Sequence, residues 1–231
     1  MNLIDHPSEP AAHKVENDTS KTRIFREVRR LIIMGHIKPG ERLDVDELAG
    51  RYQTSVTPVR DALQMLGQEE LVQIKPRSGY FVARLTLKKL RDMLQLRKIL
   101  EVSAVEMAAQ RITAEQVSEL RSVHAGYTGD DDESYDRYTD ENRRFHYLIG
   151  LASGNLELAE MIGHLHDRLA RFMVLRHGGF SQEITHAKIV EALVNKDVAA
   201  AKAALLDDID TSEDAILDRV LDEIAPSWHV D

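Results

Sequence analysis

The sequence predicts a mainly α-helical protein, in which an N-terminal winged helix-turn-helix domain precedes an antiparallel bundle of about six helices. Three observations support this prediction. Aromatic residues make up only 5% of the 231 residues, whereas Ala, Leu and Val are plentiful. Strand-like alternation of apolar and polar residues occurs only between positions 72 and 83. The net charge of −9 is also distributed unevenly along the chain.

The charge changes sign near residue 85. Residues 20–84 hold twelve Lys and Arg against eight Asp and Glu, a net +4, whereas residues 85–231 hold 17 against 27, a net −10. Such asymmetry favours a nucleic-acid-binding module joined to a domain with another role, although an excess of +4 also arises by chance. The charge of the whole chain therefore does not exclude DNA as a partner.

Several classes of protein are excluded by composition. The absence of cysteine excludes a disulfide scaffold, a cysteine zinc finger, an iron–sulfur cluster and a cysteine nucleophile. Apolar runs reach only four or five residues, too short to cross a membrane. Residues 1–19 are polar and lack the apolar core of a signal peptide, so we expect them to form a disordered tail of a cytoplasmic protein. Residues 227–231 are expected to form a short C-terminal tail.

Three helices and a two-stranded ribbon are predicted for the N-terminal domain. Ser20 caps the first helix, and Asp44 opens a short second helix with a capping box. Ser55 caps the third helix, and the proline three residues later falls in its first turn. Residues 72–75 and 80–83 alternate as strands on either side of a tight turn. This order of elements is that of a winged helix-turn-helix.

The C-terminal domain, residues 85–226, is expected to be entirely helical. Thr86 caps a helix almost at once, so the joint between the domains is short. The helical periodicity predicts helices at about 87–110, 114–127, 134–152, 156–176, 182–194 and 197–224.

The third helix is the candidate DNA-reading element, because the second helix of a helix-turn-helix enters the major groove with its N-terminal residues at base edges. Ser55 and Thr57 can bond to phosphates or bases, and Arg60 can pair with a guanine edge or hold a phosphate. Alternatively, the two hydroxyls only cap the helix and Arg60 is solvated, but their joint placement argues against this. Further phosphate contacts are expected from Arg51, Lys75 and Arg77.

Residues 22–84 carry several motifs in a fixed order, namely Gly35-x-x-Lys38-Pro39-Gly40-x-x-Leu43, Leu48-Ala49, Ser55-x-Thr57-Pro58-Val59-Arg60-x-Ala62-Leu63 and Arg77-x-Gly79-x-x-Val82. In these motifs the segment resembles the winged-helix domain of GntR-type bacterial transcription regulators. The resemblance implies a homodimer that reads an inverted-repeat operator in double-stranded DNA, with Gly79 of the wing at the DNA. Val56 stands where the family usually has Arg, so the operator sequence is expected to differ, and Val56 could meet a thymine methyl.

Four polar residues of the C-terminal domain form a candidate metal site. Asn142 and His146 are four residues apart and share one helix face. His186 and Asp208 lie about equally far from the turn that joins the last two helices, so they can face each other. Two imidazoles and one carboxylate suit a divalent metal, with Asn142 as a weaker ligand. The alternative is that these histidines are ordinary core or surface residues. His164 and His166 are two residues apart and point apart on a helix, so we expect them at the surface or at an interface.

Residues 90–225 carry Arg97-x-x-Leu100-Glu101, Phe145-His146-x-x-Ile149 and Ser153-Gly154-Asn155. They resemble the FCD effector domain of the FadR-type branch of the same regulators. The resemblance implies a divalent metal (zinc, nickel or manganese) beside a small carboxylic-acid effector. The ligand positions of the family fall on Asn142, His146, His186 and Asp208. Asn142 replaces an Asp of the family and Asp208 replaces a His.

Arg97 is the candidate anchor for the effector carboxylate, since a guanidinium pairs with a carboxylate through two bonds. The alternative for Arg97 is a surface ion pair with Glu101, four residues later. Arg143 is a second candidate for binding the effector. The sequence therefore predicts a DNA-binding transcription regulator, not an enzyme, that responds to a small carboxylate. A metal-dependent hydrolase using His146, His186 and Asp208 is the alternative, although no His-Glu-x-x-His motif occurs.

Overall fold

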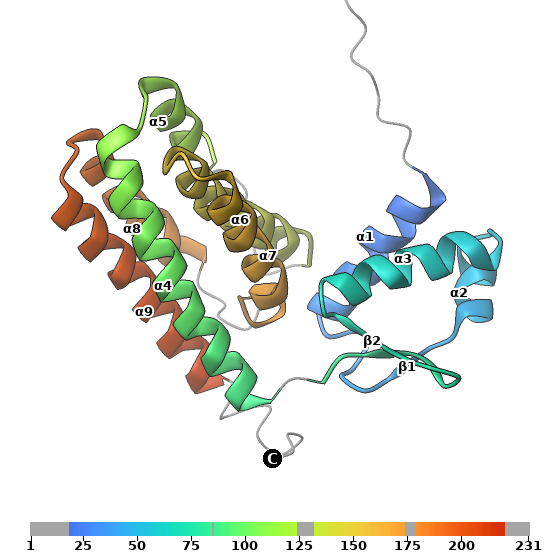
Figure 1. Ribbon diagram of the computed structural model, residues 1–231. Coiled ribbons are helices and arrows are strands. Elements are labelled where there is room, and N and C mark those ends of the chain that lie inside the picture. Colours follow the sequence, from blue (N-terminus) through green and yellow to red (C-terminus); the bar gives the residue numbers. More distant parts are fainter. Residues whose placement is uncertain (1–18, 85, 124–131, 174–178, 220–231) are drawn as a thin grey trace, which may run out of the picture.

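The computed structural model describes residues 19–84, 86–123, 132–173 and 179–219 (Figure 1). Within them, an N-terminal domain with a small sheet precedes a helical C-terminal domain, and each has its own apolar core. The first domain contains α1 (Ser20–Ile33), β1 (Arg42–Leu43), α2 (Val45–Arg51), α3 (Val56–Gln68), β2 (Val72–Lys75) and β3 (Gly79–Val82). The second contains α4 (Leu87–Arg111), α5 (Ala114–Arg121), α6 (Asp132–Ala152), α7 (Leu156–Met173), α8 (Gly179–Val194) and α9 (Val198–Arg219).

The N-terminal domain has the predicted order of three helices and a wing, with one additional strand. The sheet has the order β1-β3-β2, and both pairs are antiparallel. Both predicted strands are present as β2 and β3, whereas β1 was not predicted because it pairs only two residues, too few to show alternation. Leu43 of β1 is buried in the core that α1, α2 and α3 form against the sheet.

Helix caps explain where the first helices begin. Thr19, and not Ser20 as predicted, caps α1 by accepting a bond from the Thr22 amide. Asp44 caps α2 through the amides of Asp46 and Glu47, as predicted. Apart from Thr19, the two tails predicted from the sequence lie outside the described residues.

The C-terminal domain is built around α4. The hairpin of α6 and α7 packs against α4, and the hairpin of α8 and α9 packs against it from another side (Figure 1). All six predicted helices are present, but the second ends at Arg121, with Ser122 as its C-cap, and not at about residue 127 as predicted. The ends predicted for the fourth and sixth helices, at about residues 176 and 224, lie outside the described residues. This arrangement turns residues of α4, α6, α7, α8 and α9 towards a common interior.

Gly150 allows α6 and α7 to approach closely. A Cβ atom at this position would lie 2.7 Å from the Cα atom of Ala159, a distance that real Cβ atoms do not adopt. The close approach brings His146 of α6 beside His166 of α7, and their rings stack with centroids 4.6 Å apart. The small residue therefore positions two imidazoles of the interior.

Candidate functional site

The N-terminal end of α3 presents polar side chains to the surface. Ser55 occupies the N-cap position but makes no cap hydrogen bond through its side chain. Ser55, Thr57 and Arg60 are exposed, whereas Val59 on the same helix is fully buried in the core. The exposed face of α3 therefore carries the hydroxyls and the guanidinium that a major-groove contact requires.

Val56 lies at the boundary between this surface and the core. It is half-buried and packs against the apolar core of the N-terminal domain. Arg51, at the end of α2, is exposed and lies over the ring of Tyr52, with its Cζ atom 5.7 Å from the centroid. Both residues flank the exposed end of α3.

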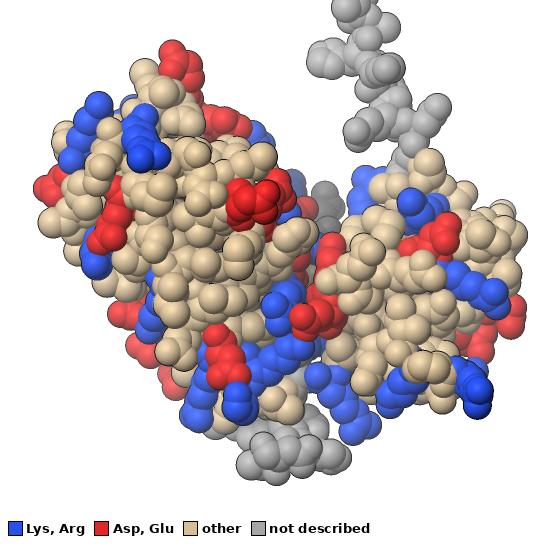
Figure 2. Space-filling view, viewed as in Figure 1, with Lys and Arg blue, Asp and Glu red and all other residues tan. Residues whose placement is uncertain are grey.

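The wing carries the other predicted DNA-contacting residues. Lys75 at the end of β2 is exposed, and its Nζ atom lies 4.8 Å from the centroid of the Phe81 ring. Arg77 and Gly79 adopt positive φ angles of 63° and 105°, which form the tight turn and leave Arg77 exposed. Figure 2 shows Lys and Arg side chains along the lower edge of the N-terminal domain, over the strands. The wing therefore carries exposed basic side chains of the kind that contact a DNA backbone.

A group of polar side chains, hereafter the polar cluster, fills the interior of the C-terminal domain. Each side chain is at most 3% exposed, and every one comes from a helix that contacts α4 or from α4 itself. The cluster consists of Arg97 and Glu101 of α4, Asn142 and His146 of α6, His166 of α7, His186 of α8 and Asp208 of α9. Since uncompensated burial of charges is costly, these groups must satisfy one another.

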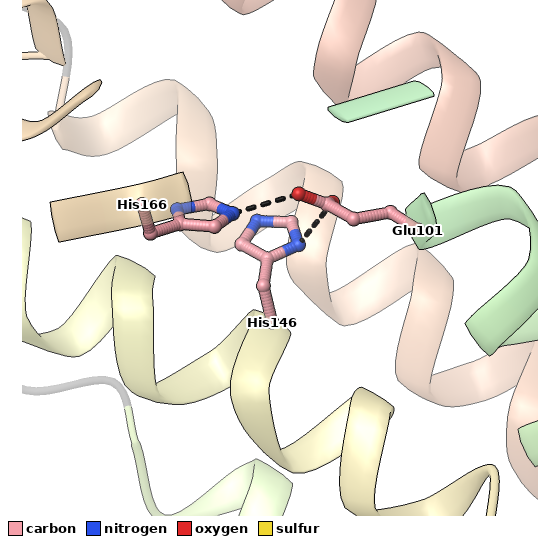
Figure 3. A group of neighbouring side chains, drawn as sticks. All are labelled: Glu101, His146 and His166. Atoms are coloured by element: carbon pink, nitrogen blue, oxygen red, sulfur yellow. Dashed lines mark hydrogen bonds and ion pairs between the residues drawn. The ribbon is translucent and has the colours of Figure 1, made fainter. Parts of the chain in front are cut away.

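Glu101 contacts three side chains of the polar cluster, of which Figure 3 shows His146 and His166. Its Oε1 atom accepts hydrogen bonds from Nε of Arg97 at 2.9 Å and from Nε2 of His166 at 2.7 Å. Its Oε2 atom lies 2.7 Å from Nδ1 of His146. The amide nitrogen of Asn142 lies 3.2 Å from the other ring nitrogen of His166. Glu101 thereby orients two imidazoles and the guanidinium.

Asp208 is the second carboxylate of the polar cluster. Its Oδ2 atom accepts a hydrogen bond from Nη2 of Arg97 at 3.2 Å, and its Oδ1 atom accepts one from the Thr185 hydroxyl at 2.7 Å. The Nε2 atoms of His146 and His186 lie 3.6 Å and 3.7 Å from its oxygens. The ring of His186 stacks on Phe145, with centroids 3.8 Å apart. The residues predicted to meet across the last hairpin therefore do meet.

Charge pairing determines the ionisation of the cluster. Burial opposes ionisation of Asp208, but His186, His146 and Arg97 outweigh it and lower its pKa to about 2. Burial also opposes ionisation of Glu101, and the positive charge of Arg97 chiefly holds the pKa of Glu101 well below its usual range. Burial lowers the pKa of His166 to about 4. At neutral pH the cluster thus contains two carboxylates, one guanidinium and a neutral His166.

Two sets of side chains in the polar cluster have the spacing of metal ligands. One set is His146, His186 and Asp208, and the other is Glu101, His146 and His166; within each, the ligand atoms lie within 4.8 Å of one another. The first set contains three of the four residues predicted from the sequence, and imidazole with carboxylate suits zinc, nickel or manganese. In both sets a carboxylate already accepts two hydrogen bonds, Glu101 from Arg97 and His166 and Asp208 from Arg97 and Thr185. The first set is the candidate metal site because the sequence predicts all three of its residues.

The expectation that His166 lies at the surface or an interface was wrong, because its side chain lies in the interior. The alternative of a surface position for Arg97 was also wrong. His166 is 3% exposed, and its position four residues after Ile162 and three before Leu169, both buried, is the signal that could have placed it inside. Arg97 does pair with Glu101, as the alternative predicted, but both are buried. Glu101 was not identified as a site residue. His164 is exposed, as expected.

Arg143 lies at the contact between the two domains and not in the polar cluster. Its Nε atom is 2.8 Å from Oδ1 of Asp167, the residue that follows His166 on α7. The same oxygen accepts a hydrogen bond from Arg29 of α1 at 3.0 Å, and Arg29 also bonds to Glu69 at the end of α3. Figure 2 shows acidic and basic side chains together where the domains meet. Consecutive residues of α7 thus contact the polar cluster and the N-terminal domain.

Comparisons with known proteins agree with the division of the chain into an N-terminal and a C-terminal domain. Residues 20–82 match the model of the gntR family of bacterial regulatory proteins, and residues 92–211 match that of the FCD domain. The Nta operon transcriptional regulator of Aminobacter aminovorans is 32% identical over 190 residues, covering 79% of this chain and 88% of that protein. The repressor GlaR of Escherichia coli is 29% identical, covering 77% of this chain and 86% of that protein.

Solved structures show the same fold. McbR/YncC of E. coli superposes with a TM-score of 0.70 at 22% identity, covering 87% of this chain and 98% of that one. No helix among the described residues is both long and apolar enough to cross a membrane. Neither matching family is one of hydrolases, so the metal-dependent hydrolase finds no support. The chain belongs to the gntR family and is a DNA-binding transcription regulator with a C-terminal FCD domain.

Proposed function

We propose that this regulator changes its affinity for an inverted-repeat operator when its FCD domain binds a small carboxylic acid beside a divalent metal ion. The polar cluster is the observation that carries the proposal. Three side chains of the types that can bind a metal, and one guanidinium, lie in the interior of the domain, where proteins normally have apolar residues. The regulator would act in the cytoplasm as a homodimer.

His146, His186 and Asp208 would hold the metal, and Glu101 would orient His146 through its Nδ1 atom. When bound, the metal supplies positive charge for an anionic ligand. Without it, the guanidinium of Arg97 is already paired with two carboxylates, those of Glu101 and Asp208, which disfavours the binding of a further acid. Metal and acid binding are therefore coupled favourably.

Arg97 would bind the acid. Its side chain is fully buried, and among the described residues its Nη1 atom has no hydrogen-bond partner. A buried donor without a partner is costly, and a carboxylate is the acceptor that a guanidinium binds best. His166, in the polar cluster, and Asp167, which contacts Arg29 of the N-terminal domain, are neighbours on α7. A shift of α7 on binding of the acid would therefore reach the N-terminal domain.

Protein purified without a polyhistidine tag is expected to contain about one metal ion per chain, because two imidazoles and a buried carboxylate bind divalent transition metals tightly. The double substitution His146→Ala/His186→Ala should abolish this content, measured by elemental analysis. The matched control is His36→Ala/His164→Ala, which removes two exposed histidines and should retain the metal. Equal metal content in both variants would place any bound ion elsewhere.

A screen of small mono-, di- and hydroxycarboxylic acids by thermal shift tests the acid site. In zinc-loaded protein, an acid at 100 times its Kd is expected to stabilise the fold by about 2.7 kcal/mol. The same acid should raise the melting temperature much less after zinc is removed with a chelator, since Arg97 is then paired with Glu101 and Asp208. An identical increase without zinc would contradict the coupling of acid to metal.

A further inference from the structure

The tautomer of His146 follows from its partners. Nη2 of Arg97 lies 3.1 Å from Nε2 of His146, and a guanidinium only donates hydrogen bonds. Nε2 must therefore be unprotonated and accept this bond. The proton of the neutral ring is then on Nδ1, which faces Oε2 of Glu101 at 2.7 Å.

A neutral imidazole has only one nitrogen lone pair that can accept a hydrogen bond or coordinate a metal. In this structure the guanidinium of Arg97 occupies the lone pair of His146. The same Nη2 atom donates to Oδ2 of Asp208 at 3.2 Å. Arg97 thus engages two of the three side chains that would hold the metal.

We infer that Arg97 and a divalent cation are alternative partners of His146, so that Arg97 weakens metal binding and is released from His146 when the metal is bound. This inference rests on the proposed metal site and names the residue that regulates it. Either partner places positive charge beside Asp208, which is fully buried and cannot be left without compensation.

The release of Arg97 also connects the metal to the acid. Nε of Arg97 bonds to Glu101 at 2.9 Å, which holds the base of the guanidinium within the polar cluster. When Nη2 no longer bonds to His146, neither terminal nitrogen of Arg97 bonds to an imidazole. The two nitrogens then form the pair of donors that a carboxylate requires. Arg97 thereby changes from an internal cross-link to the anchor for the acid.

A simple structural role for Arg97 predicts the opposite effect of its removal. If Arg97 only supports the ligand side chains, then Arg97→Gln disorders them and weakens metal binding. If Arg97 competes for the lone pair, Arg97→Gln frees His146 and Asp208, and the metal binds more tightly. The sign of the change in affinity therefore distinguishes the two roles.

The test measures the Kd for zinc alone, by competition with a chromogenic chelator, in full-length protein stripped with EDTA. Arg97→Gln is expected to bind zinc about 10 to 100 times more tightly than the natural chain, because zinc no longer displaces a hydrogen bond to a charged group. The matched control Lys98→Gln removes the same charge from the next residue of α4, which pairs with Asp210 and Glu213 outside the cluster, and should not change the Kd.

The outcomes separate this inference from the proposed function. If the natural chain binds zinc and Arg97→Gln binds it equally or more weakly, the inference is overturned and the metal site stands. If neither protein binds zinc, both are overturned. Should Arg97→Gln fail to fold, ¹⁵N spectra of the histidine rings in the natural chain decide instead. The Nε2 resonance of His146, assigned with His146→Gln, should move on zinc binding; an unchanged resonance in zinc-bound protein overturns the inference.

Discussion

Arg60→Ala is expected to weaken operator binding by about 10- to 100-fold, since loss of a bidentate base contact costs roughly 1–3 kcal/mol. The fold should be unaffected, because Arg60 is exposed on α3 while the core depends on Val59 and Leu63 of the same helix. Operator DNA selected from a random-sequence pool with the natural protein supplies the probe. Fluorescence anisotropy at one fixed salt concentration measures the Kd.

The matched control for Arg60 is Arg144→Ala. Arg144 is 58% exposed on α6 of the FCD domain, and it pairs across the surface with Glu119. Its loss removes the same charge and should leave operator affinity nearly unchanged. If the two variants bound the operator equally well, Arg60 would not be a DNA-reading residue.

Glu101→Gln is expected to lower the free energy of unfolding of the FCD domain by about 3–5 kcal/mol, the range observed when one partner of a buried ion pair is removed. The substitution keeps the shape of the side chain but removes the charge that compensates Arg97 at 2.9 Å. It also places an amide where the Nε2 proton of His166 and the Nδ1 proton of His146 need acceptors. Urea denaturation followed by circular dichroism measures the loss.

Glu106→Gln provides the control on the same helix. Glu106 is 37% exposed and pairs with Lys202 at 2.8 Å, a surface ion pair whose loss costs only about 0–1 kcal/mol. The two domains have separate cores, so the transition of the N-terminal domain should remain in place in both variants. Similar destabilisation by both substitutions would contradict the structural role assigned to Glu101.

The N-terminal domain could be predicted almost completely from sequence because its signals are local. Caps such as Asp44, the turn at Gly79 and the apolar spacing of α3 each lie within a few residues. The missed strand β1 pairs with β3, some 38 residues later in the chain, and no local pattern reveals such a short pairing.

The polar cluster could be predicted only in part. The symmetry of one hairpin predicts that His186 and Asp208 face each other, and His146 joins them because its imidazole suits a metal, an assignment that the family resemblance strengthens. The roles of Glu101 and His166 depend on how α4 and α7 pack against α6, which is a tertiary property. The residue type alone does not indicate whether a Glu or a His is buried; only its spacing relative to apolar residues can.

The central claim is that occupancy of the polar cluster changes operator affinity, and operator binding by zinc-loaded protein tests it most directly. With a saturating acid from the thermal-shift screen, the operator Kd of the natural chain should change by at least about fivefold, the lower range of allosteric coupling. The His146→Ala/His186→Ala variant should bind the operator but show no change with the acid. An operator Kd that the acid leaves unchanged in the natural chain, or changes equally in both proteins, would contradict the claim.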